Sequence, residues 1–142
     1  MSSPALSERE LVEGLFEAFN ESGGEALLDF LRENDALSPS FGACVQPDAP
    51  NGGDWPGIEG YRRMVELWME AWDTFRVVPR EIDQIADGRW LVHVTQSATS
   101  PAGFALEDPQ FIYTVMFAGN QVARIGIWND EELARAELLE GA

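Results

Sequence analysis

The chain has 142 residues and a formal net charge of −16, from 25 acidic residues against 9 basic ones. Such an acidic surface repels phosphate backbones, which argues against nucleic acid as a partner, and no apolar run is long enough to cross a membrane. With one cysteine, Cys44, and one histidine, His93, the chain cannot form an intrachain disulfide or a site of clustered imidazoles, so the sequence predicts no metal and no cofactor. The first residues lack the pattern of a secretory signal, and we therefore expect a cytoplasmic protein.

The chain begins with two predicted amphipathic helices. Ser7 and Glu10 fit a capping box, and apolar residues then recur every three or four positions up to about Asn20. Ser22 and Glu25 repeat the capping signature for a second, shorter helix. Together they predict a helical hairpin.

A polar segment and a third helix follow. Residues 38–57 are rich in Pro, Gly, Asp and Asn, and only Phe41 to Gln46 has the composition of a short strand, so the rest is predicted to be loop. The helix is predicted from about Gly57 to Asp73, because large apolar side chains recur there at helical spacing. They are Ile58, Tyr61, Met64, Val65, Trp68 and Trp72.

The second half of the chain reads as strands joined by short turns. The predicted strands are Phe75 to Ile85, Trp90 to Thr99, Phe104 to Phe117 and Val122 to Trp128. Connections this short imply an antiparallel meander. Asn129 or Asp130 is predicted to cap a last helix that ends near Leu139.

This order of elements predicts an α+β fold over residues 1–142. We expect a single domain in which helices cover one face of a curved antiparallel sheet of four to five strands that wraps around the third helix. Such a sheet leaves a cavity between itself and the long helix.

Several segments carry a family resemblance. They are Trp55 to Arg62, Ala86 to Val92, Phe117 to Ile125, and Trp128 to Glu132, where a strand ends in an aromatic residue before an acidic helix start. In spacing these segments resemble the SnoaL-like branch of the nuclear-transport-factor-2-like (NTF2-like) superfamily. The resemblance implies a cone-shaped fold, a mostly apolar pocket, and a homodimer formed through the outer face of the sheet. Its members include polyketide cyclases, ketosteroid isomerases and epoxide hydrolases, and the fold does not choose among these activities.

Asp48 is the candidate general base. It precedes Gly57 by nine residues, a spacing similar to that between the base of ketosteroid isomerases and the glycine before their long helix. A carboxylate at the edge of an apolar pocket can remove a proton next to a carbonyl. The alternative is that Asp48, between Pro47 and Pro50, is a turn residue.

Tyr113 is the candidate donor to a developing oxyanion. It lies four residues before Phe117, where the resemblance to ketosteroid isomerases implies a neutral hydrogen-bond donor. That family also uses a tyrosine of the first helix, where this chain has Phe16 and Phe19. The alternative is a strand aromatic whose hydroxyl is satisfied locally.

His93 and a set of aromatic residues complete the candidates. By strand alternation His93 shares a face with Leu91 and Thr95, opposite Val92 and Val94, and it could act as a base only if that face lines the pocket. Otherwise it is a dimer-face or satisfied histidine. The candidate ligand-binding walls, which could equally be core residues, are Tyr61, Trp68, Trp72 and Trp128.

From these residues we expect a protein that binds a small apolar or aromatic molecule. It could be a cofactor-independent isomerase or cyclase that acts by proton transfer on an apolar carbonyl compound. The alternative is a ligand-binding or dimeric interaction module without catalysis, favoured because no complete set of nucleophile, base and orienting group is evident.

Overall fold

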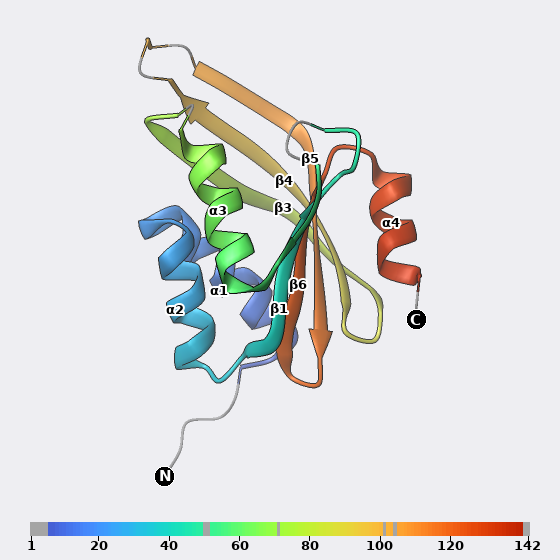
Figure 1. The fold of residues 1–142 in the computed structure, drawn as a ribbon. Coiled ribbons are helices and arrows are strands. Elements are labelled where there is room, and N and C mark those ends of the chain that lie inside the picture. Colours follow the sequence, from blue (N-terminus) through green and yellow to red (C-terminus); the bar gives the residue numbers. More distant parts are fainter. Residues whose placement is uncertain (1–5, 50–51, 71, 101, 104, 141–142) are drawn as a thin grey trace.

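The computed structural model describes residues 6–49, 52–70, 72–100, 102–103 and 105–140, with backbone alone for 106–110. Within these residues the chain forms four helices and six strands (Figure 1). In chain order they are α1 Glu8–Ser22, α2 Gly24–Glu33, β1 Leu37–Val45, β2 Gly53–Pro56, α3 Gly57–Met69, β3 Thr74–Ala86, β4 Arg89–Thr99, β5 Ala105–Ala118, β6 Gln121–Trp128 and α4 Glu131–Leu139. None of the described helices is long and apolar enough to span a membrane.

All six strands join one sheet, in the order β2-β1-β6-β5-β4-β3. The predicted antiparallel meander is confirmed for β3 to β6. The sheet is nevertheless mixed, because β1 pairs with β6 in parallel. The segment predicted as loop also contains β2, which pairs with β1 through Trp55 opposite Ala43. This edge strand is too short and too rich in Gly and Pro to show a strand pattern of its own.

The start of the helical hairpin is confirmed, and the start of its second helix is not. The Ser7 hydroxyl accepts from the Glu10 backbone N–H, and the Glu10 carboxylate accepts from the Ser7 backbone N–H, which forms the capping box. Ser22, by contrast, is the last residue of α1 rather than a cap of α2. Gly23 makes the break instead, at a φ of 84° that only glycine adopts without strain, and no side chain caps α2.

The last two helices agree with the sequence at their starts. Asp130 caps α4 by accepting from the Leu133 backbone N–H at 3.2 Å. However, α3 ends at Met69, four residues before its predicted end. Asp73, the residue before β3, already belongs to the sheet, because its N–H bonds to the carbonyl of Thr99. The chain must therefore leave the helix before Asp73.

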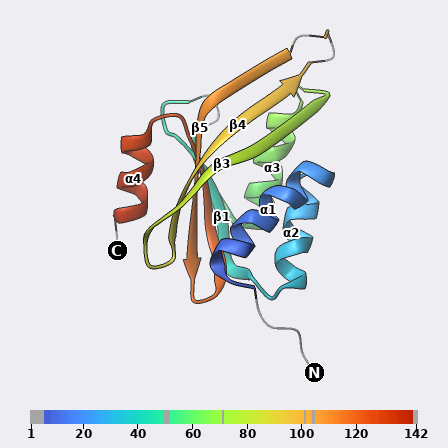
Figure 2. The ribbon, with the colours of Figure 1, turned by 180° about the vertical axis from the view of Figure 1, so that it is seen from behind.

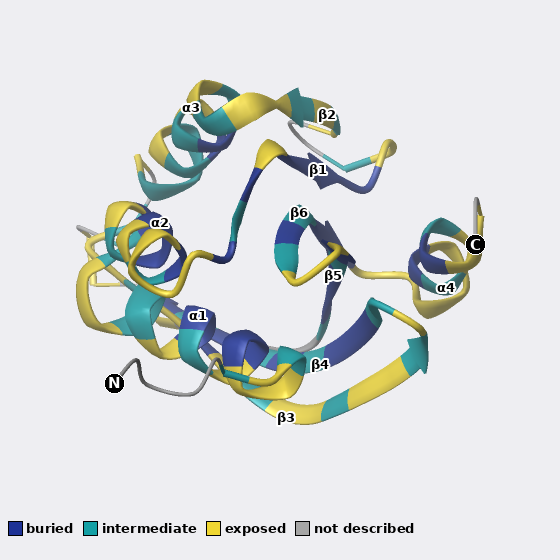
Figure 3. Cartoon of the chain, turned by 90° about the horizontal axis from the view of Figure 1, so that it is seen from below, coloured by how far each residue is buried: buried dark blue, intermediate teal, exposed yellow. Residues whose placement is uncertain are grey.

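Helices cover both faces of the sheet, not one face as predicted. α1, α2 and α3 lie on the concave face, and α4 lies on the other side (Figures 1 and 2). Alternate residues of β4 serve the two sides: Val92 and Val94 belong to the main core, whereas Leu91 packs with Ala134 and Leu138 of α4. Viewed from below, β4, β5 and β6 are largely buried, whereas β3 is largely exposed (Figure 3).

The free edge of β3 is partly covered by side chains of α1. The Asn20 amide nitrogen donates to the Val77 carbonyl, and the Val77 N–H donates to the Asn20 amide oxygen, both at 2.8 Å. Further along, Arg9 donates to the carbonyl of Ile82 at 3.1 Å. Asn20 thus takes the place of a neighbouring strand and fixes α1 over the concave face.

Replacing Asn20 should weaken this junction. Asn20→Ala leaves the backbone N–H and C=O of Val77 unpaired, so we expect the free energy of unfolding to fall by about 1–3 kcal/mol in urea denaturation. Asn34→Ala is the matched control, because that amide bonds only to the exposed carbonyl of Phe30 and should cost less than about 0.5 kcal/mol. Equal effects of the two substitutions would contradict this account of α1.

Candidate functional site

An enclosed apolar cavity lies between the three helices on the concave face and the sheet. It holds about 40 Å³ of free space. Its walls are Leu15, Phe16, Phe19, Leu27, Tyr61, Met64, Val65, Trp68, Phe75, Val77, Tyr113, Ile125 and Ile127. Among these side chains only Tyr61, Trp68 and Tyr113 carry a polar N or O atom, so any polar contact to a molecule inside must come from them.

A larger pocket, which we call the mouth, adjoins this inner cavity. The two share Trp68, Phe75 and Ile127 as walls. The mouth measures about 480 Å³, within the range of about 300–1,000 Å³ that is usual for small-molecule sites. Its other lining residues are Val45, Gln46, Ala49, Leu67, Trp72, Gln96, Ala98, Phe111, Trp128 and Asn129.

Tyr113 and Gln96 form a buried polar pair where the cavity meets β4. The Gln96 amide donates to the Tyr113 hydroxyl at 3.2 Å, and the Tyr113 ring packs edge-on against Phe16 at 5.3 Å. Burial raises the pKa of Tyr113, so its phenol stays neutral at physiological pH. Sequence reasoning missed Gln96, although strand alternation places it on the same face as Val92 and Val94.

Tyr61 and Trp68 bring two further polar groups from α3. Both the Tyr61 hydroxyl and the Trp68 indole N–H are buried, and neither has a hydrogen-bond partner in the part of the chain that the structure describes. Burial raises the pKa of Tyr61 as well, so this phenol is also neutral. The inner cavity is therefore bordered by two neutral hydroxyls and an indole N–H within apolar walls.

Asp48 lies outside both spaces. It is exposed in the turn after β1, and it lines neither the inner cavity nor the mouth. Its carboxylate accepts from the Gln46 amide at 2.6 Å. The Gln46 carbonyl oxygen in turn accepts from the N–H groups of Asn129 and Asp130, so Gln46 ties this turn to the start of α4. Asp48 thus reaches the mouth only through Gln46.

The remaining aromatic candidates border the mouth. Trp72 follows the end of α3 and contributes to its wall, as does Trp128 at the end of β6. The Trp128 indole N–H donates to the Thr114 hydroxyl at 3.0 Å, and the residue packs in the cluster beneath α4. The structure therefore brings together Tyr61, Trp68 and Tyr113 in the inner cavity, with Trp72 and Trp128 at the mouth.

Solved structures with this arrangement of helices and sheet are readily found. TerC, co-crystallised with polyporic acid, superposes with a TM-score of 0.71 and 19% identity over 94% of this chain and 98% of that chain. An NTF2-like protein of unknown function from Burkholderia pseudomallei K96243 gives 0.69 and 17%, over 92% and 95%. A protein named as a SnoaL-like polyketide cyclase, from Jannaschia sp. CCS1, gives 0.68 and 18%, over 97% and 96%.

The chain has the NTF2-like fold. This confirms the fold that the resemblance implied. The likeness is one of structure, because no protein-family model and no curated protein matches the sequence. At these identities the comparisons define the fold only. The chemistry of the cavity must be inferred from the residues that line it.

His93 lies on the outer face of this NTF2-like sheet and lines neither the inner cavity nor the mouth, so the condition under which we expected it to act as a base is not met. Its Nε2 lies 2.6 Å from the Glu131 carboxylate of α4, and its Nδ1 lies 3.7 Å from the Glu81 carboxylate of β3. The hydrogen bond from His93, aided by Arg135, lowers the pKa of Glu131. His93 therefore fastens α4 to the sheet.

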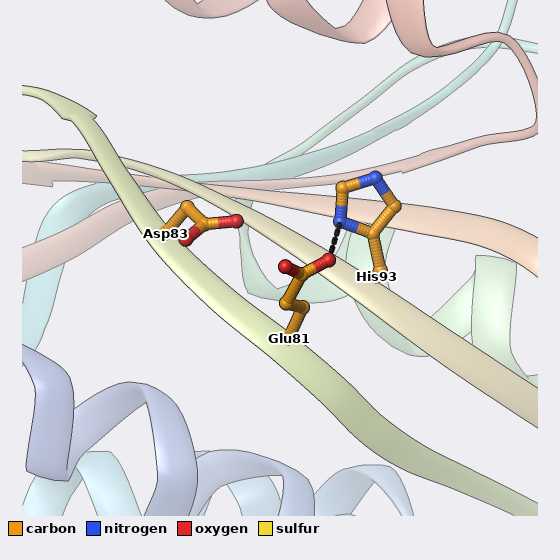
Figure 4. A group of neighbouring side chains, drawn as sticks. All are labelled: Glu81, Asp83 and His93. Carbon is orange, nitrogen blue, oxygen red and sulfur yellow. Dashed lines mark ion pairs between the residues drawn. The ribbon is translucent and has the colours of Figure 1, made fainter.

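One group of described side chains offers ligand atoms for a metal ion. Glu81, Asp83 and His93 place one ligand atom each within 4.8 Å of one another (Figure 4). The donor set suits a resident transition metal poorly, because it has a single imidazole and two exposed carboxylates. We therefore attribute the cluster to the attachment of α4.

Proposed function

We propose that the protein binds a small, planar, mostly apolar molecule, which enters through the mouth and reaches the inner cavity. The observation that carries the proposal is that Trp68, Phe75 and Ile127 line both spaces. A neighbour of the same fold, TerC, has been crystallised with polyporic acid, which supports a small molecule as the occupant.

The shape of the ligand follows from the aromatic walls. Phe75 packs edge-on against Phe19 at 6.1 Å and against Trp68 at 6.0 Å, and Trp68 packs edge-on against Phe111 at 6.3 Å. An edge-on pair covers at most one face of one of its two rings, so aromatic faces remain on which a planar ligand can stack. The inner cavity, at about 40 Å³, is smaller than a ring system, so the bulk of the ligand occupies the mouth.

Blocking the mouth should abolish binding. Naphthalene, used as a planar probe, should change the tryptophan emission of the native protein saturably, because Trp68 and Trp72 line its path. Ala49→Phe places a ring in the mouth from the turn after β1, and we expect affinity to fall by about tenfold or more. Ala136→Phe, on the exposed side of α4, is the control and should leave affinity unchanged. Unchanged binding by Ala49→Phe would exclude the mouth as the entrance.

Proton transfer is the second candidate function, with Asp48 as the base and Tyr113 as the donor to the oxyanion of an isomerase or cyclase. Two observations favour it: the Asp48 carboxylate is joined to the mouth through Gln46, and the Tyr113 phenol is neutral in the cavity. For a carbonyl substrate in the mouth, Asp48 would act as the base from behind Gln46, and Tyr113 would donate from the inner cavity. Since no described Asp, Glu or His lines either space, binding without turnover remains the first proposal.

A bicyclic β,γ-unsaturated ketone tests this activity, because its isomerisation to the conjugated enone increases near-ultraviolet absorbance. If the protein converts it, Asp48→Asn should lower turnover by roughly a hundredfold or more without changing affinity, since the substitution keeps shape and removes basicity. Tyr113→Phe should lower turnover by about the effect of one oxyanion donor, roughly a hundredfold. Asp29→Asn on the surface of α2 is the control. Full activity in Asp48→Asn would make Asp48 a turn residue only.

A homodimer is proposed through the outer sheet surface that α4 leaves open. Arg89, Met116 and Arg124 are neighbours across β4, β5 and β6, and they line a concavity of about 370 Å³. Arg124 is paired with Asp54 and Glu137, whereas the described hydrogen bond of Arg89 goes only to the sulfur of Met116.

We expect Arg89 to meet a carboxylate of the second copy. Sedimentation velocity at micromolar concentration should therefore show a dimer that Arg89→Ala weakens by about tenfold. A monomer in both proteins would rule the dimer out.

A further inference from the structure

Two buried polar groups of the inner cavity have no hydrogen-bond partner among the described residues. They are the hydroxyl of Tyr61 and the indole N–H of Trp68, and Tyr61 is only 3% exposed. The two residues are seven positions apart on α3, which puts them on one face of the helix two turns apart. Folded proteins pair nearly all such groups, because a buried donor without an acceptor loses its bonds to water and gains nothing. Two unpaired donors on one face of one helix therefore point to an occupant.

The surroundings of these groups explain why the protein itself cannot satisfy them. The Tyr61 ring packs edge-on against Phe41 at 5.4 Å, and a side chain added at Gly24 would meet only its hydroxyl and the methyl groups of Val65 as nearest atoms. The Trp68 indole is held between the rings of Phe75 and Phe111. The other indole hydrogen bonds described do have protein acceptors: that of Trp90 goes to Glu8 at 2.8 Å and that of Trp128 to Thr114. One further buried side-chain atom without a hydrogen-bond partner among the described residues, Nδ1 of His93, lies on the outer face, where the Glu81 carboxylate is 3.7 Å away.

We propose that the ligand is an uncharged molecule with an acceptor oxygen, a ketone or quinone carbonyl, that is held by the O–H of Tyr61 and the N–H of Trp68. This inference rests on the proposed binding function. An indole N–H can only donate, so the ligand must supply the acceptor. None of the described residues that line the cavity or the mouth is cationic, so an ionised carboxylate or phosphate would be buried there without a counter-charge from them. Tyr61 and Trp68 then bind the ligand, and their unpaired donors destabilise the ligand-free protein.

If Tyr61 binds the ligand and does not stabilise the free protein, its substitution should change the melting temperature in the opposite direction to that of a structural tyrosine. Tyr61→Phe removes an unpaired buried hydroxyl and keeps the ring, so the melting temperature of the ligand-free protein should rise by about 3 °C. Tyr113→Phe is the matched control with the opposite sign, because it leaves the buried amide of Gln96 without its acceptor and should lower the melting temperature. If Tyr61→Phe also lowers it, the hydroxyl already has a partner such as a buried water, and the proposal is overturned.

A pair of probes of equal shape tests the ligand chemistry. Indane and 1-indanone differ by one carbonyl, and a cavity without donors would prefer the hydrocarbon, since an unpaired carbonyl is costly to bury. We expect the native protein to bind 1-indanone about tenfold more tightly than indane by calorimetry, and Tyr61→Phe to abolish or reverse that preference while its affinity for indane is retained. In ¹⁵N-labelled protein, the indole N–H signal of Trp68, assigned through Trp68→Phe, should move downfield with 1-indanone and not with indane.

The outcomes separate this inference from the function on which it rests. Saturable binding of both probes with no preference for 1-indanone would overturn the carbonyl subsite and leave small-molecule binding intact. Tighter binding of phenyltrimethylammonium than of 1-indanone would mean that the aromatic walls select a cation, which also overturns the subsite. No binding of any probe, naphthalene included, would refute the proposed function and this inference together.

Discussion

The structure depends on the fact that its central strands are apolar on both faces. Along β4, Leu91 and Val92 are both fully buried, although their side chains point to opposite sides of the sheet. A single layer of helices cannot cover both sides, and the chain solves this with α1 to α3 on the concave face and α4 on the other. The curvature that lets the sheet enclose α3 also keeps these helices from filling the concave side completely. The inner cavity is what remains, and its apolar lining comes from the same alternation that builds the core.

Local patterns in the sequence predicted much of this arrangement. The capping box at Ser7, the cap at Asp130 and the four meander strands depend on residues close together in the chain, so the sequence could reveal them. The four-residue strand β2 is too short and too rich in Gly and Pro to show a strand pattern. The parallel pairing of β1 with β6 depends on partners about 80 residues away, which no local pattern encodes. The end of α3 was misplaced for the same reason, because the pairing of the β3 start with Thr99 decides it.

The candidate site followed the same division. Helical spacing found Tyr61 and Trp68, and strand position found Tyr113, because large aromatic residues on the inner face of an element are readily seen. The surroundings of single polar residues were not predictable. Asp48 is exposed in the turn after β1 and reaches the mouth only through Gln46, and His93 bonds to Glu131 of α4 on the outer face. The sequence did not indicate Gln96 as a site residue, because a glutamine in a strand is usually at the surface. Only the fold shows that the Gln96 amide bonds to the Tyr113 hydroxyl.

The pairing of Asn20 with Val77 has a consequence for the behaviour of the protein at high concentration. A long exposed edge strand such as β3 is a template on which another extended chain can dock and start aggregation. At the β3 edge, the Asn20 amide takes the place of a peptide group, and the strand carries charged residues such as Arg76 and Glu81. At the opposite edge of the sheet lies the four-residue strand β2, which ends in Pro56. Both margins thus resist the addition of a strand, so the sheet cannot grow into a fibre by stacking native copies edge to edge.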